Sequence, residues 1–380
     1  MLKINFRTNI IALILTSLFL VYISPSANAE PSTILGTTGD EPIGITIDSL
    51  GNIYTANGAS NNVSKITPQG VSTTLGTTGA NPFGITIDSS GNIYTANNVD
   101  NTVTKITPGG VSTTLGTTGN NPRGILIDSS GNIYTANYGA NNVSKITPGG
   151  VSTILGTTGA NPFAITIDSS GNIYTANDVD NTVTKITPQG VSTILGTTGA
   201  NPFGITIDSS GNIYTSNTGA DTVSKITPQG VSTTLGTTGA QPVGITIDSS
   251  GNIYTANNVD NTVTKITPQG VSTTLGTTGA YPFGITIDSS GNIYTSNNFG
   301  ATVTKITVFD QAAANAEAAR KAKEQKELTE ILALIPSIGE LTLSLGETTQ
   351  SLYSTKCVKG KTTKYVKYGA KCPKGYVKKK

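Results

Sequence analysis

One segment of 40 residues recurs seven times along this chain, and it constrains the fold more than any other feature. The string Gly-Asn-Ile-Tyr-Thr begins at residues 51, 91, 131, 171, 211, 251 and 291, and Leu-Gly-Thr-Thr-Gly recurs at the same interval. A repeat of this length is typical of helical arrays and of β-propellers, in which neighbouring units bury one another's apolar faces. The internal composition of the unit has to distinguish the two.

The composition favours strands. Each unit contains short β-branched runs, such as residues 45–47, 53–55 and 71–73, bounded by turn sequences at 48–52 and 68–70. No part of the unit is free of Gly, Pro and Asn for long enough to form a helix of ordinary length. We therefore predict four strands per unit, at 44–48, 52–57, 63–67 and 71–76 in the first, which is one propeller blade.

The phase of the repeats predicts a closed ring. A copy of the fourth strand, beginning at Ser32, precedes the first unit, whereas the last unit stops at Thr307 without a fourth strand of its own. An N-terminal strand that completes the last blade would leave no blade unpaired. An open solenoid would instead need atypical capping repeats at both ends, so we expect an all-β, seven-bladed propeller over residues 30–309.

The repeated motif resembles a known family. The pattern P-x-G-I-x-I-D-x-x-G-N-I-Y-x-A-N, followed by N-x-V-x-K-I and a glycine turn, is similar to the NHL repeat and, more loosely, to the SMP-30 and streptogramin-lyase propellers. The resemblance covers about 280 of the 380 residues, and these propellers include enzymes and binding modules alike. The chain departs from the pattern in two respects: Asn57 and its equivalents stand where the NHL strand commonly ends in aspartate, and the chain has none of the histidine that the lyases use.

The units differ from one another mainly in two loops, before the first strand and between the second and third. In an antiparallel blade these loops lie on the same face, so one rim should carry any specific site. The residue after the turn proline there is Ile43, Phe83, Arg123, Phe163, Phe203, Val243 or Phe283. Aromatic rings around a channel mouth suit the apolar faces of sugars or protruding protein side chains, whereas the alternative is that they fill space between blades.

Other rim residues also break the sevenfold symmetry. The candidates for ligand binding are Asp40, Glu41, Tyr138 and Tyr281, together with Phe83, Arg123, Phe163, Phe203 and Phe283 of the collar. Paired carboxylates can act as acid and base, which keeps open an SMP-30-like or lyase-like enzyme that uses rim carboxylates. We predict no metal and no cofactor, because the converging carboxylates that the metal-binding SMP-30 propellers use are asparagines here.

The two ends of the chain differ in character from the repeats. Residues 1–29 combine Lys3 and Arg7, an apolar run and Ala27-Asn28-Ala29, which is typical of a secretory signal peptide, too short to serve as a membrane anchor. Residues 310–352 are rich in helix formers and predict a helical linker or stalk. Residues 353–380 contain both cysteines, and in an oxidising compartment Cys357 and Cys372 should form a disulfide that closes a small basic hairpin.

The charge is distributed unevenly. Residues 30–309 carry eight basic and 15 acidic residues, whereas residues 351–380 carry ten lysines and no acid. Such a tail should attract anionic envelope polymers, and nothing in it indicates sequence-specific nucleic acid binding. The sequence therefore predicts a secreted or envelope-associated bacterial binding protein, with a glycan or cell-surface protein as its partner; the alternatives are the enzyme and a ligand-free structural spacer.

Overall fold

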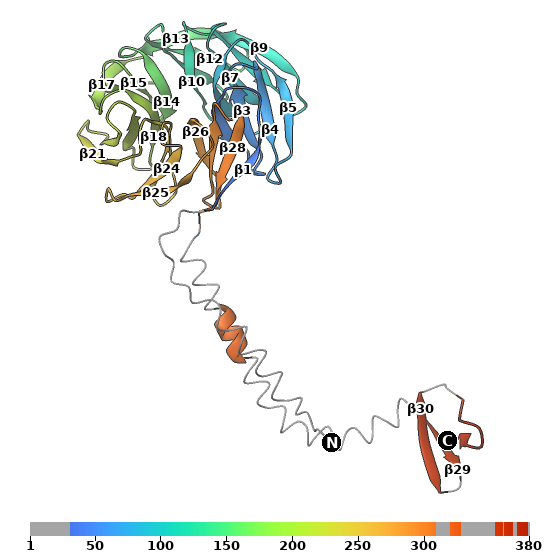
Figure 1. Ribbon diagram of the computed structural model, residues 1–380. Helices are drawn as coiled ribbons and strands as arrows, with labels where there is room; N and C mark the ends of the chain where they lie inside the picture. Colours follow the sequence, from blue (N-terminus) through green and yellow to red (C-terminus); the bar gives the residue numbers. More distant parts are fainter. Residues whose placement is uncertain (1–30, 309–319, 328–353, 360, 368–370, 379–380) are drawn as a thin grey trace. The chain divides into compact units, whose positions relative to one another are not determined.

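Seven four-stranded antiparallel sheets follow one another around a ring (Figure 1). The computed structural model describes residues 31–308, 320–327, 354–359, 361–367 and 371–378, so the predicted signal peptide at 1–29 lies outside the described residues. Contacts divide the chain into two units, residues 1–308 and 309–380. The predicted seven-bladed β-propeller is confirmed.

Each blade is built from the four strands that the repeat predicted. The first contains β2 (Pro42–Ile47), β3 (Ile53–Asn57), β4 (Asn62–Ile66) and β5 (Ser72–Thr77), paired in that order from the channel outwards. The later blades repeat these bounds: β6 (Pro82–Ile87), β7 (Ile93–Asn97), β8 (Thr102–Ile106), β9 (Ser112–Thr117); β10 (Pro122–Ile127), β11 (Ile133–Asn137), β12 (Asn142–Ile146), β13 (Ser152–Thr157); β14 (Pro162–Ile167), β15 (Ile173–Asn177), β16 (Thr182–Ile186), β17 (Ser192–Thr197); β18 (Pro202–Ile207), β19 (Ile213–Asn217), β20 (Thr222–Ile226), β21 (Ser232–Thr237); β22 (Pro242–Ile247), β23 (Ile253–Asn257), β24 (Thr262–Ile266), β25 (Ser272–Thr277); β26 (Pro282–Ile287), β27 (Ile293–Asn297), β28 (Thr302–Ile306).

The first strand of the ring closes the last blade. Strand β1 (Ser32–Thr37) pairs antiparallel with β28, with Ser32 opposite Ile306 and Thr37 opposite Thr302. Two further backbone hydrogen bonds extend the junction, from the Thr307 amide to the Pro31 carbonyl (3.0 Å) and from the Thr38 amide to the Ala301 carbonyl (2.8 Å). Closure therefore depends on the two ends of the repeat array meeting in one sheet, as the missing fourth strand predicted.

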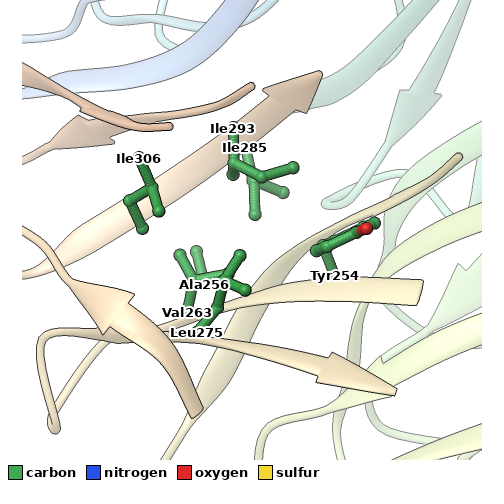
Figure 2. Packing of buried hydrophobic residues seen from close by; sticks show 7 residues of the cluster. All are labelled: Tyr254, Ala256, Val263, Leu275, Ile285, Ile293 and Ile306. Atoms are coloured by element: carbon green, nitrogen blue, oxygen red, sulfur yellow. The ribbon is translucent and has the colours of Figure 1, made fainter. Parts of the chain in front are cut away.

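The core of the ring lies between blades. Seven clusters of buried apolar side chains each join two neighbouring blades, and Figure 2 shows the one in which Tyr254, Ala256, Val263 and Leu275 of the sixth blade pack against residues of the seventh. Two isoleucines of every blade, equivalent to Ile53 and Ile66, have no exposed surface. Burial of each contributes about 2 kcal/mol, so the blades stabilise one another.

Glycine allows the innermost strands to approach closely. A Cβ atom on Gly44 would lie 2.6 Å from the carbonyl oxygen of Phe83 in the next blade, and one on Gly244 would lie 2.5 Å from that of Phe283. Real side chains do not tolerate such contacts with backbone. Glycine therefore suits this position in six of the seven blades, and alanine, the smallest side chain, stands there in the fourth as Ala164.

The C-terminal unit contains a small sheet with strand order β30-β29-β31. Strand β29 (Ser354–Lys359) pairs with β30 (Thr362–Lys367) and with the short β31 (Val377–Lys378), so the predicted hairpin gains a third strand. The predicted disulfide joins Cys357 to Cys372, with a Cα–Cα distance of 5.6 Å.

Part of the predicted linker is helical. Residues 320–327 form a helix with an Arg320–Glu324 ion pair one turn apart, and the rest of the 310–352 segment lies outside the described residues. Among the described residues, no helix has the length and apolar character needed to cross a bilayer.

Candidate functional site

The ring has two faces of different kinds. One face carries the loops at residues 38–41 and 58–61. Within the blade, the Gly58 amide donates to the Glu41 carbonyl (2.8 Å) and joins the two loops. The Thr78 amide, in the loop that leads to the next blade, donates to the Asn61 carbonyl (2.9 Å). We call these loops and their equivalents at intervals of 40 residues the variable rim. The turns at 48–52 and 67–71, with their equivalents, form the opposite side, called here the turn face.

The turn face is built around an aspartate in every blade. The Asp208 carboxylate accepts hydrogen bonds from the Ser210 amide (2.9 Å), the Asn212 amide (2.8 Å), the Asn212 side chain (2.7 Å) and the Tyr214 hydroxyl (3.0 Å). The ammonium nitrogen of Lys225 lies 5.7 Å from the centroid of the same tyrosine ring. The same arrangement occurs in all seven blades, which assigns the repeated aspartate to turn structure.

These hydrogen bonds also control protonation. Burial alone would raise the pKa of Asp208, but the hydrogen bonds from Asn212, Tyr214 and the Ser210 amide outweigh burial and hold that pKa below its usual value. Burial, followed by the hydrogen bond to the neighbouring aspartate, raises the pKa of Tyr94 and of Tyr134 to about 12. Each pair is therefore held as a carboxylate and a neutral phenol at neutral pH.

The asparagine that ends the second strand of each blade is a structural residue. Asn97 is fully buried, accepts from the Thr95 hydroxyl (3.0 Å) and donates to the hydroxyls of Thr102 (2.9 Å) and Thr104 (2.8 Å). Within the described residues no group of three or more acidic or cysteine side chains is placed to hold a metal ion.

The central channel is closed by aromatic rings. A cavity of about 200 Å³ is lined by the first residues of the seven innermost strands, including all seven members of the predicted collar. The rings of Phe163 and Phe203 stack at 4.0 Å between centroids, while Phe83 meets Phe163 at 5.3 Å and Phe283 at 5.4 Å in edge-to-face geometry. Phe83 thus contacts rings of two blades that are not its neighbours, across the channel, whereas Phe163 and Phe203 stack between adjacent blades.

Arg123 occupies the equivalent position in the third blade, within this aromatic group. Its guanidinium carbon lies 3.6 Å from the centroid of the Tyr138 ring, 4.6 Å from that of Phe163 and 5.3 Å from that of Phe83. Burial lowers the pKa of Arg123, and the nearby Tyr138 and Asp178 oppose that shift. The Nε atom is buried without a hydrogen-bond acceptor among the described residues.

Asp178 holds the tyrosine over the arginine. Asp178 is 7% exposed. Its carboxylate accepts hydrogen bonds from the Tyr138 hydroxyl (3.3 Å) and from the Asn201 side-chain amide (3.1 Å). Arg123 and Tyr138 come from the third blade and Asp178 from the fourth. We call these three residues the Arg123 cluster.

The Arg123 cluster shows what the sequence alone did not resolve. Its members are separated by up to 55 positions, and each departs from its equivalents: Arg123 from mostly phenylalanine, and Tyr138 and Asp178 from Gly58, Asn98, Thr218, Asn258 and Asn298. Sequence comparison of the units identified Arg123 and Tyr138 as candidate ligand-binding residues. Their convergence depends on how the neighbouring blades are placed, which the repeat does not specify.

The remaining candidates are not among the residues that line the channel cavity. Asp40 and Glu41 are exposed, the Asp40 amide donates to the Ser60 hydroxyl (2.7 Å), and Glu41 adopts a left-handed backbone conformation. Tyr281 packs on the exposed Phe299 ring of its own blade at 4.6 Å between centroids. Asp40 and Glu41 thus lie where the chain passes from the closing strand of the seventh blade into the first, whereas Tyr281 lies in the loop from the sixth blade to the seventh, where its amide donates to the Asn261 side chain (2.7 Å).

The junction of the seventh and first blades lacks a hydrogen bond that the other six junctions have. Between other blades, a side-chain oxygen accepts from the amide of the following blade, as Asn61 does from Asn81 (2.7 Å). The equivalent residue in the seventh blade is Ala301, which has no such oxygen and still adopts a φ of 45°. The junction therefore has weaker side-chain support than its equivalents.

Comparison with known proteins places the fold among characterised propellers. The profile of the virginiamycin B lyase family matches residues 28–194 and 152–324. The structure of virginiamycin B lyase from Staphylococcus aureus aligns with a TM-score of 0.66 and 22% identity over 73% of this chain and 99% of that chain. A streptogramin B lyase structure aligns with a TM-score of 0.65 and 18% identity over 74% of this chain and 99% of that one.

A further structure bears on catalysis in those enzymes. It is a catalytically inactive histidine-to-alanine variant of the S. aureus lyase with quinupristin, which aligns at 21% identity and a TM-score of 0.64 over 73% of this chain and 99% of that one. Identities at this level show similarity of fold. No curated protein matches the chain.

Proposed function

The chain belongs to the virginiamycin B lyase family, and within that family we propose that it is an exported binding protein. It holds one ligand at the channel mouth of its variable rim, and that ligand is part of a glycan or of a cell-surface protein. The observation that carries this proposal is the Arg123 cluster. Three residues that each break the sevenfold symmetry meet above an aromatic cavity. A residue that recurs in every blade marks no single position around the rim, so a ligand bound to one side of the axis needs such a departure.

The absence of histidine supports binding over lyase chemistry. The chain contains none, whereas replacement of one histidine leaves the S. aureus lyase catalytically inactive. A histidine-dependent reaction therefore has no counterpart here.

The binding proposal is tested with the mature full-length chain on glycan and surface-protein arrays. Tyr138→Asn and Asp178→Asn introduce the residue found at the equivalent positions of three other blades, so both variants should fold. We expect each to lose the signal of the wild-type protein, while Asp260→Asn, which neutralises a rim carboxylate in the sixth blade, should retain it. Equal binding by all four proteins would mean that the ligand binds away from the Arg123 cluster, and no signal from any of them would leave the spacer as the better description.

Family membership favours one alternative, an enzyme that uses rim carboxylates. Its substrates would be lactones, sugar esters or the streptogramins of the related lyases, assayed with and without divalent metal. Turnover that Asp40→Asn or Glu41→Gln abolishes would replace the binding proposal, because neither residue belongs to the Arg123 cluster.

The lysine-rich tail is proposed to retain the protein at an anionic surface. Ten lysines without an acid occupy residues 351–380, and such a charge attracts polyanions in a salt-dependent manner. Deletion of residues 353–380 should move the protein from the cell fraction to the medium, as high salt should for the intact chain. Identical fractionation at low and high salt would contradict retention by charge.

A further inference from the structure

Arg123 is the basic residue of the ring that the fold does not account for. The other seven bases of residues 31–308 are the lysines equivalent to Lys65, each over a tyrosine of the turn face. Arg123 instead replaces an apolar residue inside the aromatic group. Arg123 is partly buried, and withdrawing a cation from water without a hydrogen-bonded partner costs stability, which a bound anion would offset.

Aromatic neighbours satisfy only part of what a guanidinium requires. Rings stabilise the cation through their π faces, but its five N–H donors point outward in the guanidinium plane and require oxygen or nitrogen acceptors. The Nε donor is buried without one among the described residues. Asp178 is committed to Tyr138 and Asn201, and it makes no ion pair within 4.0 Å of Arg123. A ligand oxygen at the channel mouth would supply an acceptor for this donor.

The adjoining cavity restricts the size and polarity of that ligand. Its volume is about 200 Å³ and its walls include Phe83, Phe163, Phe203 and Phe283. An apolar cavity of about 150 Å³ is large enough for benzene. The space beside the guanidinium thus fits one six-membered ring with a small polar substituent.

We propose that the channel mouth binds an anionic group carried on a small apolar ring, with the Arg123 guanidinium on the anion and the phenylalanines around the ring. A carboxylate matches the planar fork of arginine with two parallel hydrogen bonds. Tyr138 and Asp178 act as positioning residues, because the hydrogen bond between them fixes the ring that covers the guanidinium. The inference rests on the proposed function and names the chemistry by which its ligand is anchored.

The test measures the affinity of the full-length protein for benzoate by titration calorimetry or ligand-observed NMR, against benzamide, the neutral compound of the same shape. Benzoate should bind at least about tenfold more tightly, since a charge-assisted pair exceeds a neutral one. Acetate alone should bind more weakly than benzoate, because it leaves the aromatic walls unused.

Arg123→Phe is the decisive variant, because phenylalanine occupies the equivalent position in four other blades and the ring should accept it. Benzoate affinity should fall at least about tenfold, while the urea midpoint stays equal or rises. Arg123→Lys keeps the charge but not the planar fork and should recover affinity only in part. Lys265→Met removes one charge from the turn face and should bind as the wild type does.

Two results would overturn the inference: equal affinity for benzoate and benzamide, or a lowered midpoint of Arg123→Phe with unchanged benzoate affinity, which would mark Arg123 as structural. Failure here is distinguishable from failure of the proposed function. If array ligands still depend on Tyr138 and Asp178 but benzoate does not compete with them, the rim binds its ligand by other contacts and only the anion inference falls.

Discussion

The turn face and the variable rim are made by the same strands, yet they use charge in opposite ways. On the turn face each aspartate is saturated by hydrogen bonds from its own turn and each lysine covers a tyrosine, seven times over. On the rim the charges are irregular, and the Arg123 cluster leaves a buried donor without an acceptor. The two faces thus differ in regularity: the aspartates of the turn face are satisfied in the same way in every blade, whereas the Arg123 cluster occurs once in the ring.

The largest expected effect tests the turn face as a whole, through pH. Folding lowers the pKa of the seven aspartates below the ordinary 3.8, so their contribution to stability is lost as the pH falls below that value. Folding raises the pKa of the tyrosines above 10.0, so their contribution is present below pH 10 and declines as the pH rises towards 12. The urea midpoint should be flat between about pH 5 and 9 and fall on both sides.

That profile has a clear contrary outcome. The chain has no histidine, so a steep change between about pH 6 and 7.5 would show that other groups dominate the stability of the ring. Equilibrium urea unfolding followed by circular dichroism at a series of pH values makes the measurement.

The next prediction has a smaller expected effect and compares the loss of one aspartate from each face. Asp208→Ala removes the acceptor of four hydrogen bonds and should lower the free energy of unfolding by about 3 kcal/mol. Asp180→Ala on the rim removes one, from the Ala160 amide, and should lower it by about 1 kcal/mol or less. Equal losses in urea unfolding would mean that the two faces contribute alike.

The smallest effect concerns the junction of the seventh and first blades. Ala301→Asn supplies the side-chain oxygen that six other interfaces have and suits the left-handed backbone, so the free energy of unfolding should rise by about 1 kcal/mol. Ala301→Gly is the matched control, because it relieves the backbone without adding the acceptor. If both variants gain equally, the hydrogen bond contributes nothing.

The sequence predicted the ring and its closing strand, because seven copies of the repeat show the same pattern of strands and turns. It predicted the disulfide because the chain has only two cysteines to pair. Strand β2, for example, begins two residues before its predicted start, within the ordinary uncertainty of strand ends. The site was harder to predict. Variation among the units identified Arg123 and Tyr138, but whether the phenylalanines filled spaces between blades or met across the channel depended on how closely the innermost strands approach one another, as at Gly44.

The pairing of β1 with β28 has a mechanical consequence. Because the strands are antiparallel and Ser32 lies opposite Ile306, both ends of the ring leave the last blade at the same side. A force applied between them would open the ladder one residue pair at a time, starting from the first, instead of loading every pair at once. The other six blades would bear none of that load until β1 had separated from β28.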